Sequence, residues 1–260
     1  MTALLELAGI TQRFGGVVAL SEVDLAVPEG SIFALIGPNG AGKTTVFNLV
    51  TGVYTPTQGE IRFAGERISG LRPHHVTEQG IARTFQNIRL FDNMSALENV
   101  MVGADARHKT GVIGAALGLP RHRREEKHGR ERGLELLEFV GVAAAAEETA
   151  KNLSYGDQRR LEIARALATE PKLLLLDEPA AGLNDSETRS LMNTIHDIRD
   201  RFNIAILLIE HNMELVMGIC ERIVVLNFGK TIAEGTPEAI RANPAVIEAY
   251  LGEPAAEAEV

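Results

Sequence analysis

Gly37-Pro38-Asn39-Gly40-Ala41-Gly42-Lys43-Thr44-Thr45 is the stretch of this sequence that decides the fold, and it directly follows an almost continuous apolar run from Ser31 to Ile36. A buried strand, a glycine-rich turn and a helix, in that order, let backbone N–H groups turn inward around phosphate oxygens. The expected helix, from about Gly42 to Thr51, adds its positive N-terminal end, and Lys43 adds a full charge near the β- and γ-phosphates. The Thr44 hydroxyl is placed to ligate Mg²⁺. The sequence therefore predicts a phosphate-binding loop for a nucleoside triphosphate.

A second strand supplies the acidic half of this site. Four leucines, Leu173 to Leu176, are followed by Asp177 and Glu178, and ligands bind beyond the carboxyl ends of the strands in open α/β sheets. We expect Asp177 to hold the Mg²⁺ shell through water, and Glu178 to orient the attacking water and accept its proton. Together with the loop, this carboxylate pair predicts hydrolysis of the triphosphate.

Strands and helices alternate over most of the chain. Apolar alternation predicts short strands at Leu4 to Leu7 and at Leu25 to Val27. Beyond residue 153 we expect two long helices and a short one, each leading into a strand. The long helices span about 155–169 and 186–201, and the strands span 173–176, 204–209 and 223–226. This order predicts an α/β core whose parallel sheet is covered on both faces.

A helical insertion interrupts this core. Residues 87–152 are rich in alanine, leucine and charge, with helical spacing at Leu134, Leu137 and Val140. Within them, the dense charge run from Arg121 to Arg132 is typical of a solvated helix face. We therefore expect residues 87–152 to form a helical subdomain.

The whole chain, residues 1–260, is expected to form one domain. Its core and β subdomain comprise residues 1–86 and 153–235, on either side of the insertion. C-terminal helices and a disordered tail follow over residues 236–260, since the last residues, 253–260, are small and acidic.

Bulk properties limit the class of protein further. The chain has 260 residues, 45% hydrophobic and 23% charged, which is an ordinary globular composition. Its apolar runs are shorter than a bilayer-spanning helix needs, and its start lacks the pattern of a signal peptide. The single cysteine, Cys220, fits a reducing compartment. A net charge of −9 argues against a nucleic-acid partner, so we expect membrane association only through a partner protein.

A second anion-binding pattern lies between the loop and Asp177, in Leu153-Ser154-Tyr155-Gly156-Asp157-Gln158. Ser154 and Gly156 stand at the expected start of a helix, where a hydroxyl, backbone amides and the helix dipole form an anion site. One anion site is enough for a subunit to bind the γ-phosphate of its own nucleotide. A second anion site is needed only when it binds the nucleotide of another copy of the chain. The stretch resembles the signature sequence of ABC ATPases, usually Leu-Ser-Gly-Gly-Gln, and it lies where that family carries it.

The resemblance to ABC ATPases implies both a fold and an assembly. The fold is an α/β P-loop NTPase core with an N-terminal antiparallel β subdomain and an inserted helical subdomain. The assembly is a head-to-tail dimer, in which ATP and Mg²⁺ lie between the loop of one subunit and Ser154, Tyr155 and Gly156 of the other.

The same resemblance implies further site residues. Gln86 matches the family's Q-loop, whose amide reaches Mg²⁺, and His211 matches the switch histidine that contacts the γ-phosphate beside Lys43 and Glu178. Phe14 matches the aromatic residue that stacks on adenine, with a core phenylalanine as the competing interpretation. The D-loop position at the dimer interface is occupied by Gly182, Leu183 and Asn184.

Three positions depart from the family pattern. Tyr155 replaces the first glycine of the signature, Asp157 replaces its glutamine, and Asn184 stands where many relatives have aspartate. Ser154 and Gly156, the expected phosphate contacts, are retained. The departures therefore concern the coupling between the two sites rather than ATP hydrolysis itself.

Over nearly its whole length the chain resembles the ATP-binding subunit of bacterial branched-chain amino-acid importers. The segments that carry this resemblance are Arg13 to Gly16, Thr84 to Phe91, Tyr155 to Arg165, Asp177 to Asn184, Leu208 to His211, Ala249 to Glu253 and the extra helical stretch from about Asp105 to Arg132. The resemblance implies uptake of leucine, isoleucine and valine. It also implies a second ATPase subunit, two transmembrane permeases and, indirectly, a periplasmic binding protein. The chain would lie at the cytoplasmic face of the inner membrane, bound through the permeases.

Two alternatives remain open from the sequence. The first is the ATPase of a related transporter, for urea, amides or lipopolysaccharide. The second is a soluble ABC ATPase of an assembly system. Translation factors of this type carry two cassettes, whereas this chain has one P-loop, and repair-type members insert coiled coils, for which the sequence has no sustained heptads. Recovery of polytopic membrane proteins with the tagged chain distinguishes a transporter subunit from a soluble ATPase.

Overall fold

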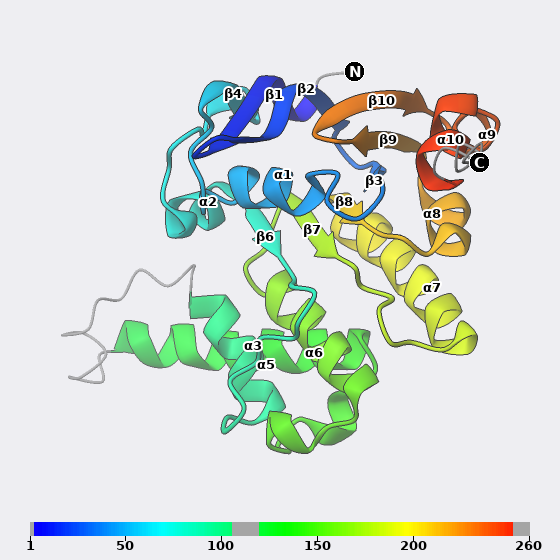
Figure 1. Ribbon diagram of the computed structural model, residues 1–260. Coiled ribbons are helices and arrows are strands. Elements are labelled where there is room, and N and C mark those ends of the chain that lie inside the picture. Colours follow the sequence, from blue (N-terminus) through cyan, green and yellow to red (C-terminus); the bar gives the residue numbers. More distant parts are fainter. Residues whose placement is uncertain (1–2, 106–119, 252–260) are drawn as a thin grey trace, which may run out of the picture. The chain divides into compact units, whose positions relative to one another are not determined.

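The computed structural model describes residues 3–105 and 120–251 (Figure 1). The chain divides into two compact units, which we call the core unit and the helical unit. The core unit comprises Met1–Val76 and Leu175–Val260, and the helical unit comprises Thr77–Leu174. The expected disordered tail, 253–260, and part of the expected extra helical stretch, 106–119, lie outside the described residues.

An antiparallel sheet opens the core unit. In order of pairing, its strands are β2 (Val17–Pro28), β1 (Ala3–Phe14), β4 (Gln58–Phe63) and β5 (Glu66–Arg67). Along β2, Val23, Leu25 and Val27 are buried and alternate with exposed residues, because successive side chains of a strand point to opposite faces. This sheet confirms the expected antiparallel β subdomain, and β1 and β2 contain the two short strands predicted there.

A second sheet carries the parallel strands. Its order is β10 (Lys230–Gly235), β9 (Arg222–Asn227), β3 (Ile32–Ile36), β8 (Ala205–Ile209), β7 (Leu173–Asp177) and β6 (Ile81–Arg83). β3 runs parallel to both β8 and β9. Every residue of β3, β7 and β8 is buried, as strands covered on both faces must be. The expected α/β core is confirmed. The boundary between the two units passes through β7, and β6 belongs to the helical unit.

The edge strand β10 is antiparallel, whereas the sequence predicted only parallel strands for this sheet. It pairs antiparallel with β9, because Phe228 and Gly229 between the strands have φ angles of 44° and 75° and form a two-residue turn. None of its six residues is fully buried. β10 therefore lacks the apolar run that marks β3, β7 and β8, and the sequence did not predict a strand there.

Helices follow several strands of the core unit. Those with residues in this unit are α1 (Lys43–Val50), α2 (Pro73–Gln79), α7 (Asp185–Phe202), α8 (Met213–Ile219), α9 (Pro237–Arg241) and α10 (Pro244–Leu251). The ends of α7 have clear local causes. Asn184 and Glu187 form a reciprocal capping box at its start, and Asn203, with φ of 50°, ends it in the left-handed region. α1 and α7 confirm the helices expected near 42–51 and 186–201.

The described residues of the helical unit include α3 (Ala96–Asp105), α5 (Pro120–Phe139) and α6 (Tyr155–Leu167), with short 3-10 turns at Ala143–Ala145 and Ala150–Asn152. α3 and α6 approach closely at Gly103, where a Cβ atom would lie 2.3 Å from the Arg165 carbonyl oxygen and 3.1 Å from the Ala168 Cβ. None of the described helices has the length and apolar character needed to cross a membrane.

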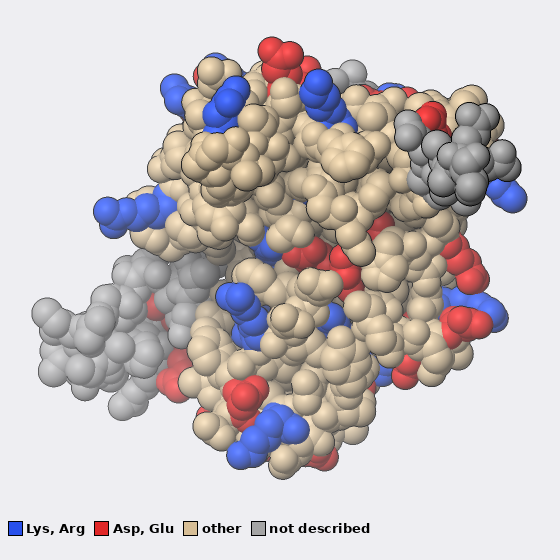
Figure 2. All heavy atoms as spheres, viewed as in Figure 1, with Lys and Arg blue, Asp and Glu red and all other residues tan. Residues whose placement is uncertain are grey.

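Charged side chains of both signs are mixed over the face drawn in Figure 2. Some form ion pairs at the surface, such as Arg222 with Glu234 at 2.7 Å and Arg130 with Glu147 at 2.8 Å. Solvent-exposed pairs of this kind contribute little to stability. The fold therefore depends on its buried strands and helix contacts rather than on these pairs.

The close approach at Gly103 gives a test of the helical unit. Gly103→Ala should lower the midpoint of urea denaturation, because the added Cβ atom pushes α3 away from α6 at a cost of about 1–3 kcal/mol. That cost outweighs the preference for alanine over glycine in a helix, which is about 1 kcal/mol. Gly16→Ala is the control, since a Cβ atom there meets no atom within 4 Å. Equal midpoints for both variants would contradict the α3–α6 contact.

Candidate nucleotide-hydrolysis site

The phosphate-binding loop joins β3 to α1 and is built on two glycines that no other residue could replace. Gly37 has φ of 151°, and a Cβ atom there would lie 2.1 Å from the carbonyl oxygen of Leu226. Gly42 has φ of 105°, and its Cβ atom would lie 2.6 Å from the Cδ2 of Leu20. Glycine alone fits such close approaches and positive φ angles. The loop between them includes the exposed residues Asn39 and Gly40, and Thr44 is exposed at the start of α1.

Lys43 lies inside this loop rather than in solvent. Its side chain is buried, with 8% of the residue exposed, and its Nζ donates to the carbonyl oxygens of Gly37 at 2.7 Å and Pro38 at 3.0 Å. Burial lowers the pKa of Lys43, while the nearby carboxylates of Glu178 and Asp177 raise it. The Lys43 amine thus binds backbone carbonyls of the loop and lies near the carboxylate pair that the sequence predicts as the acidic half of the site.

The carboxylates lie at the carboxyl end of β7. Asp177 is its last residue and is buried. Glu178 follows with φ of 49°, and its N–H donates to the Ile209 carbonyl at the end of β8 at 2.9 Å. Its Oε2 lies 3.7 Å from the Nδ1 of His211. The core unit therefore brings together Lys43, Asp177, Glu178 and His211.

Two other predicted features of the core unit have well-defined surroundings. Phe14 ends β1 and is 41% exposed, with its ring 5.0 Å from the Tyr54 ring in an edge-on contact. It is therefore a surface aromatic residue rather than a core one. In the predicted D-loop, Gly182 is exposed and Leu183 half-buried. Asn184 accepts from the Glu187 N–H at 3.0 Å and starts α7, which gives this departure from aspartate a local structural role.

The predicted signature belongs to the helical unit, at the start of α6. Ser154 is the N-cap, and its Oγ accepts from the Asp157 N–H at 3.2 Å and donates to the Asp157 Oδ2 at 2.8 Å. Tyr155 is exposed and Gly156 half-buried. Asp157, which replaces the usual glutamine, thus already engages the hydroxyl that the sequence predicts as a phosphate contact.

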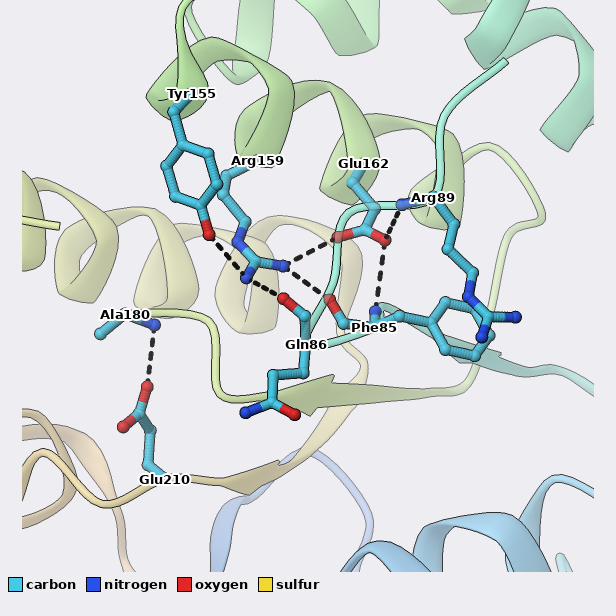
Figure 3. A network of polar contacts seen from close by, with 8 residues as sticks. All are labelled: Phe85, Gln86, Arg89, Tyr155, Arg159, Glu162, Ala180 and Glu210. Atoms are coloured by element: carbon cyan, nitrogen blue, oxygen red, sulfur yellow. Dashed lines mark hydrogen bonds and ion pairs between the residues drawn. The ribbon is translucent and has the colours of Figure 1, made fainter. Parts of the chain in front are cut away.

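Gln86 is an exposed residue of the helical unit, and its backbone is fixed by an ion pair that the sequence did not indicate (Figure 3). Arg159 and Glu162 of α6 are 5% and 1% exposed. Arg159 donates to the Phe85 carbonyl at 2.6 Å, to the Gln86 carbonyl, and to the Tyr155 hydroxyl at 3.1 Å. The only sequence signal was their i, i+3 spacing on the expected helix.

Glu162 completes this attachment. Its Oε1 accepts from the N–H groups of Phe85 at 3.2 Å and Arg89 at 3.3 Å, and its Oε2 accepts from Arg159 at 3.3 Å. Burial raises the pKa of Glu162, and the Arg89 N–H and the charge of Arg159 oppose this shift. Beside it lies a groove of about 470 Å³, lined among others by Arg83, Arg89, Leu90, Phe91, Glu162 and Arg165.

The C-terminal helix α10 contacts the phosphate-binding loop through Tyr250. Tyr250 is 41% exposed, and its partial burial raises its pKa, while a hydrogen bond with the Gly37 backbone opposes the shift. A neighbouring hollow of about 660 Å³ is lined by loop and α10 residues that include Pro38, Asn39, Ala245 and Glu248. No motif in the sequence linked this segment to the loop.

These features define the class of protein as an ATP-binding cassette, and solved structures agree. The ADP conformation of an ATP-binding cassette of an ABC transporter matches with a TM-score of 0.84 and 30% identity, covering 97% of this chain and all of that one. A dimeric cassette in a post-hydrolysis state, bound to ADP and phosphate, matches with a TM-score of 0.76 and 25% identity, covering 90% of this chain and 98% of that one.

Sequence comparison gives the family. The ABC transporter family matches residues 20–181, and the family of branched-chain amino acid ATP-binding cassette transporters matches residues 230–256. The high-affinity branched-chain amino acid transport ATP-binding proteins BraF of Pseudomonas aeruginosa and LivG of Salmonella typhimurium are each 50% identical over 250 residues, covering 96% of this chain and 98% of theirs. LivG of Escherichia coli is 49% identical over the same shares. The chain therefore belongs to the ABC transporter family, as one of its ATP-hydrolysing subunits.

The position of Lys43 leads to a direct prediction. Lys43→Ala should lower ATP hydrolysis by about 10³-fold or more, the scale of removing one cation from a phosphoryl-transfer site. It should also weaken nucleotide binding sharply, because the charge near the β- and γ-phosphates is lost. Phosphate release and nucleotide titration measure the two effects. Lys230→Ala, which changes an exposed lysine of β10, should behave as the parent. Near-normal turnover of Lys43→Ala at saturating Mg-ATP would rule out this role for the loop.

Proposed function

We propose that this chain hydrolyses ATP to drive the uptake of leucine, isoleucine and valine through a membrane transporter. The observation that carries the proposal is the buried Lys43 beside Asp177 and Glu178. The chain that contains this site is 50% identical to branched-chain amino acid transport ATP-binding proteins along almost their whole length. Radiolabelled leucine uptake, in cells with and without the chain, tests it. Unchanged leucine uptake together with lost urea uptake would favour the related-transporter alternative.

The proposed roles follow from the chemistry of each group. The loop from Gly37 to Thr45 binds the phosphates through backbone N–H groups, and Phe14 offers an exposed ring to adenine. The exposed Thr44 hydroxyl and the Asp177 carboxylate are hard oxygen ligands and fit Mg²⁺, with Gln86 as a third ligand. When bound there, Mg²⁺ would neutralise charge on the β- and γ-phosphates.

Glu178 is the proposed general base. Its carboxylate orients water for attack on the γ-phosphate and takes the proton. His211, within 3.7 Å of Glu178 and with most of its side chain exposed, contacts the γ-phosphate. Lys43 stabilises negative charge on the same phosphate oxygens.

The proposed active assembly is a head-to-tail dimer with a second ATPase subunit. Ser154, Tyr155 and Gly156 of one subunit close over the nucleotide of the other, and Gly182, Leu183 and Asn184 lie at the interface. A dimeric solved relative supports this arrangement. So does α6, whose N-terminal end carries the partial positive charge that an anion requires.

The proposed permease contact is the groove beside Gln86. Its walls combine apolar side chains such as Leu90 and Phe91 with Arg83, Arg89 and Arg165, a lining suited to a short amphipathic helix. Each of the two permeases would occupy the groove of one ATPase subunit. The dimer would then lie on the cytoplasmic face of the inner membrane, fed indirectly by a periplasmic binding protein. Co-purification of polytopic membrane proteins with the tagged chain tests this, and their absence would favour a soluble assembly ATPase.

Glu178→Gln separates nucleotide binding from chemistry. The variant should bind ATP but hydrolyse it about 10²–10⁴-fold more slowly, because the amide cannot accept the proton. It should accumulate as an ATP-dependent dimer, with itself or with the second ATPase subunit, and associate weakly in ADP. Light scattering measures the dimer, and Glu66→Gln, at an exposed carboxylate of β5, is the control. Parent-like hydrolysis contradicts the role of Glu178, whereas lost hydrolysis without any ATP-dependent dimer contradicts the dimer.

Arg89→Glu tests the groove. Arg89 is exposed, and its guanidinium lies 4.6 Å from the Phe85 ring centre. Charge reversal should lower transport by about tenfold, equivalent to about 1.4 kcal/mol of docking energy, and should lower the ATPase rate of the isolated subunit much less. Arg130→Glu, which reverses an exposed charge on α5, should leave both rates near the parent values. Equal losses in both rates for Arg89→Glu would assign the residue to the ATP site or the fold.

A further inference from the structure

We propose that Glu210 is a positioning residue for ATP hydrolysis, which fixes the loop after Glu178 to the segment that carries His211. The proposal rests on the catalytic roles proposed above for those two residues. Glu210 itself touches neither ATP nor water in this scheme. It acts through the backbone of its neighbours.

Glu210 is a buried carboxylate stabilised by backbone groups. It follows β8 directly and is 1% exposed. Its Oε1 accepts from the Ala180 N–H at 2.8 Å, and its Oε2 accepts from the N–H groups of His211 and Asn212, each at 2.9 Å (Figure 3 shows the bond to Ala180). A carboxylate taken out of water needs several such donors to remain charged.

The three bonds reach two different segments of the chain. Ala180 lies two residues after Glu178, beyond β7, whereas His211 and Asn212 lie beyond β8. One carboxylate therefore sets the separation between the segment with the proposed base and the segment with the proposed γ-phosphate contact. In this arrangement the Oε2 of Glu178 lies 3.7 Å from the Nδ1 of His211.

The backbone of Glu178 makes such a restraint necessary. Its φ of 49° places a residue with a Cβ atom in the left-handed region, which persists only when the surroundings fix it. Before the strained residue, the bond from its own N–H to the Ile209 carbonyl fixes the chain at 2.9 Å. After it, the bond from Ala180 to Glu210 fixes the chain again. Both anchors come from the end of β8.

Glu210→Asp should break only the hydrogen bond that joins the two segments. The shorter side chain keeps its charge and can still accept from the adjacent His211 and Asn212 N–H groups, but it cannot also reach Ala180. We expect kcat to fall about tenfold or more, while KM for ATP and the affinity for Mg-ADP stay within about threefold of the parent, the pattern of an interaction needed only for the chemical step. Glu210→Gln should show the same split, because the neutral amide is a poorer acceptor for three donors.

Glu214→Gln is the matched control, since Glu214 lies on α8 four residues later with 63% of its side chain exposed. It should keep the parent's kcat. Melting temperatures identify variants that are merely unfolded, and if Glu210→Gln does not fold, Glu210→Asp decides. A kcat of Glu210→Asp within twofold of the parent overturns the proposal. So does a parallel loss of kcat, nucleotide affinity and melting temperature, which indicates a purely structural role.

Glu178→Gln, measured in parallel, separates this proposal from the one on which it rests. If Glu178→Gln hydrolyses ATP at the parent's rate, the role of Glu178 is wrong and the role of Glu210 falls with it. If Glu178→Gln is inactive while Glu210→Asp retains the parent's kcat, only the role of Glu210 is wrong. Inactive Glu178→Gln with a selective loss of kcat in Glu210→Asp supports both.

Discussion

The parallel pairing of β3 with β8 and β9 positions the groups on which the proposed chemistry depends. Ile32 to Leu35 pair in register with Ile206 to Ile209, and Phe33 to Ile36 pair with Arg222 to Val225. β7 lies beside β8, and the N–H of Glu178 donates to the Ile209 carbonyl, so β7 and β8 end on the same side of the sheet. The loop leaves β3 there, Glu178 leaves β7 and His211 leaves β8.

Buried charges in both units are stabilised largely by backbone groups. Glu210 accepts three backbone N–H groups in the core unit. Glu162 accepts two in the helical unit, where Arg159 donates to two backbone carbonyls. Each of these side chains thereby restrains an irregular segment that has no ladder or helix of its own. A buried polar group left without such partners is costly, so the side chain and the segment it holds depend on each other.

The sequence predicted the parts of the fold whose signal is local. The apolar runs at 31–36 and 173–176 and the glycine-rich loop indicated β3, β7 and α1 correctly. β6 and β10 were missed, because three residues, or six partly exposed ones, give no apolar run. For the site, the sequence motifs predicted Lys43, Asp177, Glu178 and His211. The roles of Glu210 and Glu162 were missed, because the bonds that join them to Ala180, Phe85 and Arg89 reach segments far away in the sequence and leave no local pattern.

The same physical argument accounts for the unusual signature of this chain. Tyr155 occupies a glycine position, yet its hydroxyl accepts from Arg159, the residue that also binds the Phe85 and Gln86 carbonyls. Asp157 occupies a glutamine position, yet it forms two hydrogen bonds with the N-cap Ser154 and pairs with Arg160 at 3.2 Å. A carboxylate in the first turn also interacts favourably with the helix dipole. Both substitutions thus stabilise the start of α6. In the proposed dimer, the hydroxyl of Ser154 would have to exchange its bond to Asp157 for a bond donated to a phosphate. The two substitutions would then affect the closing of the nucleotide site more than the chemistry within it.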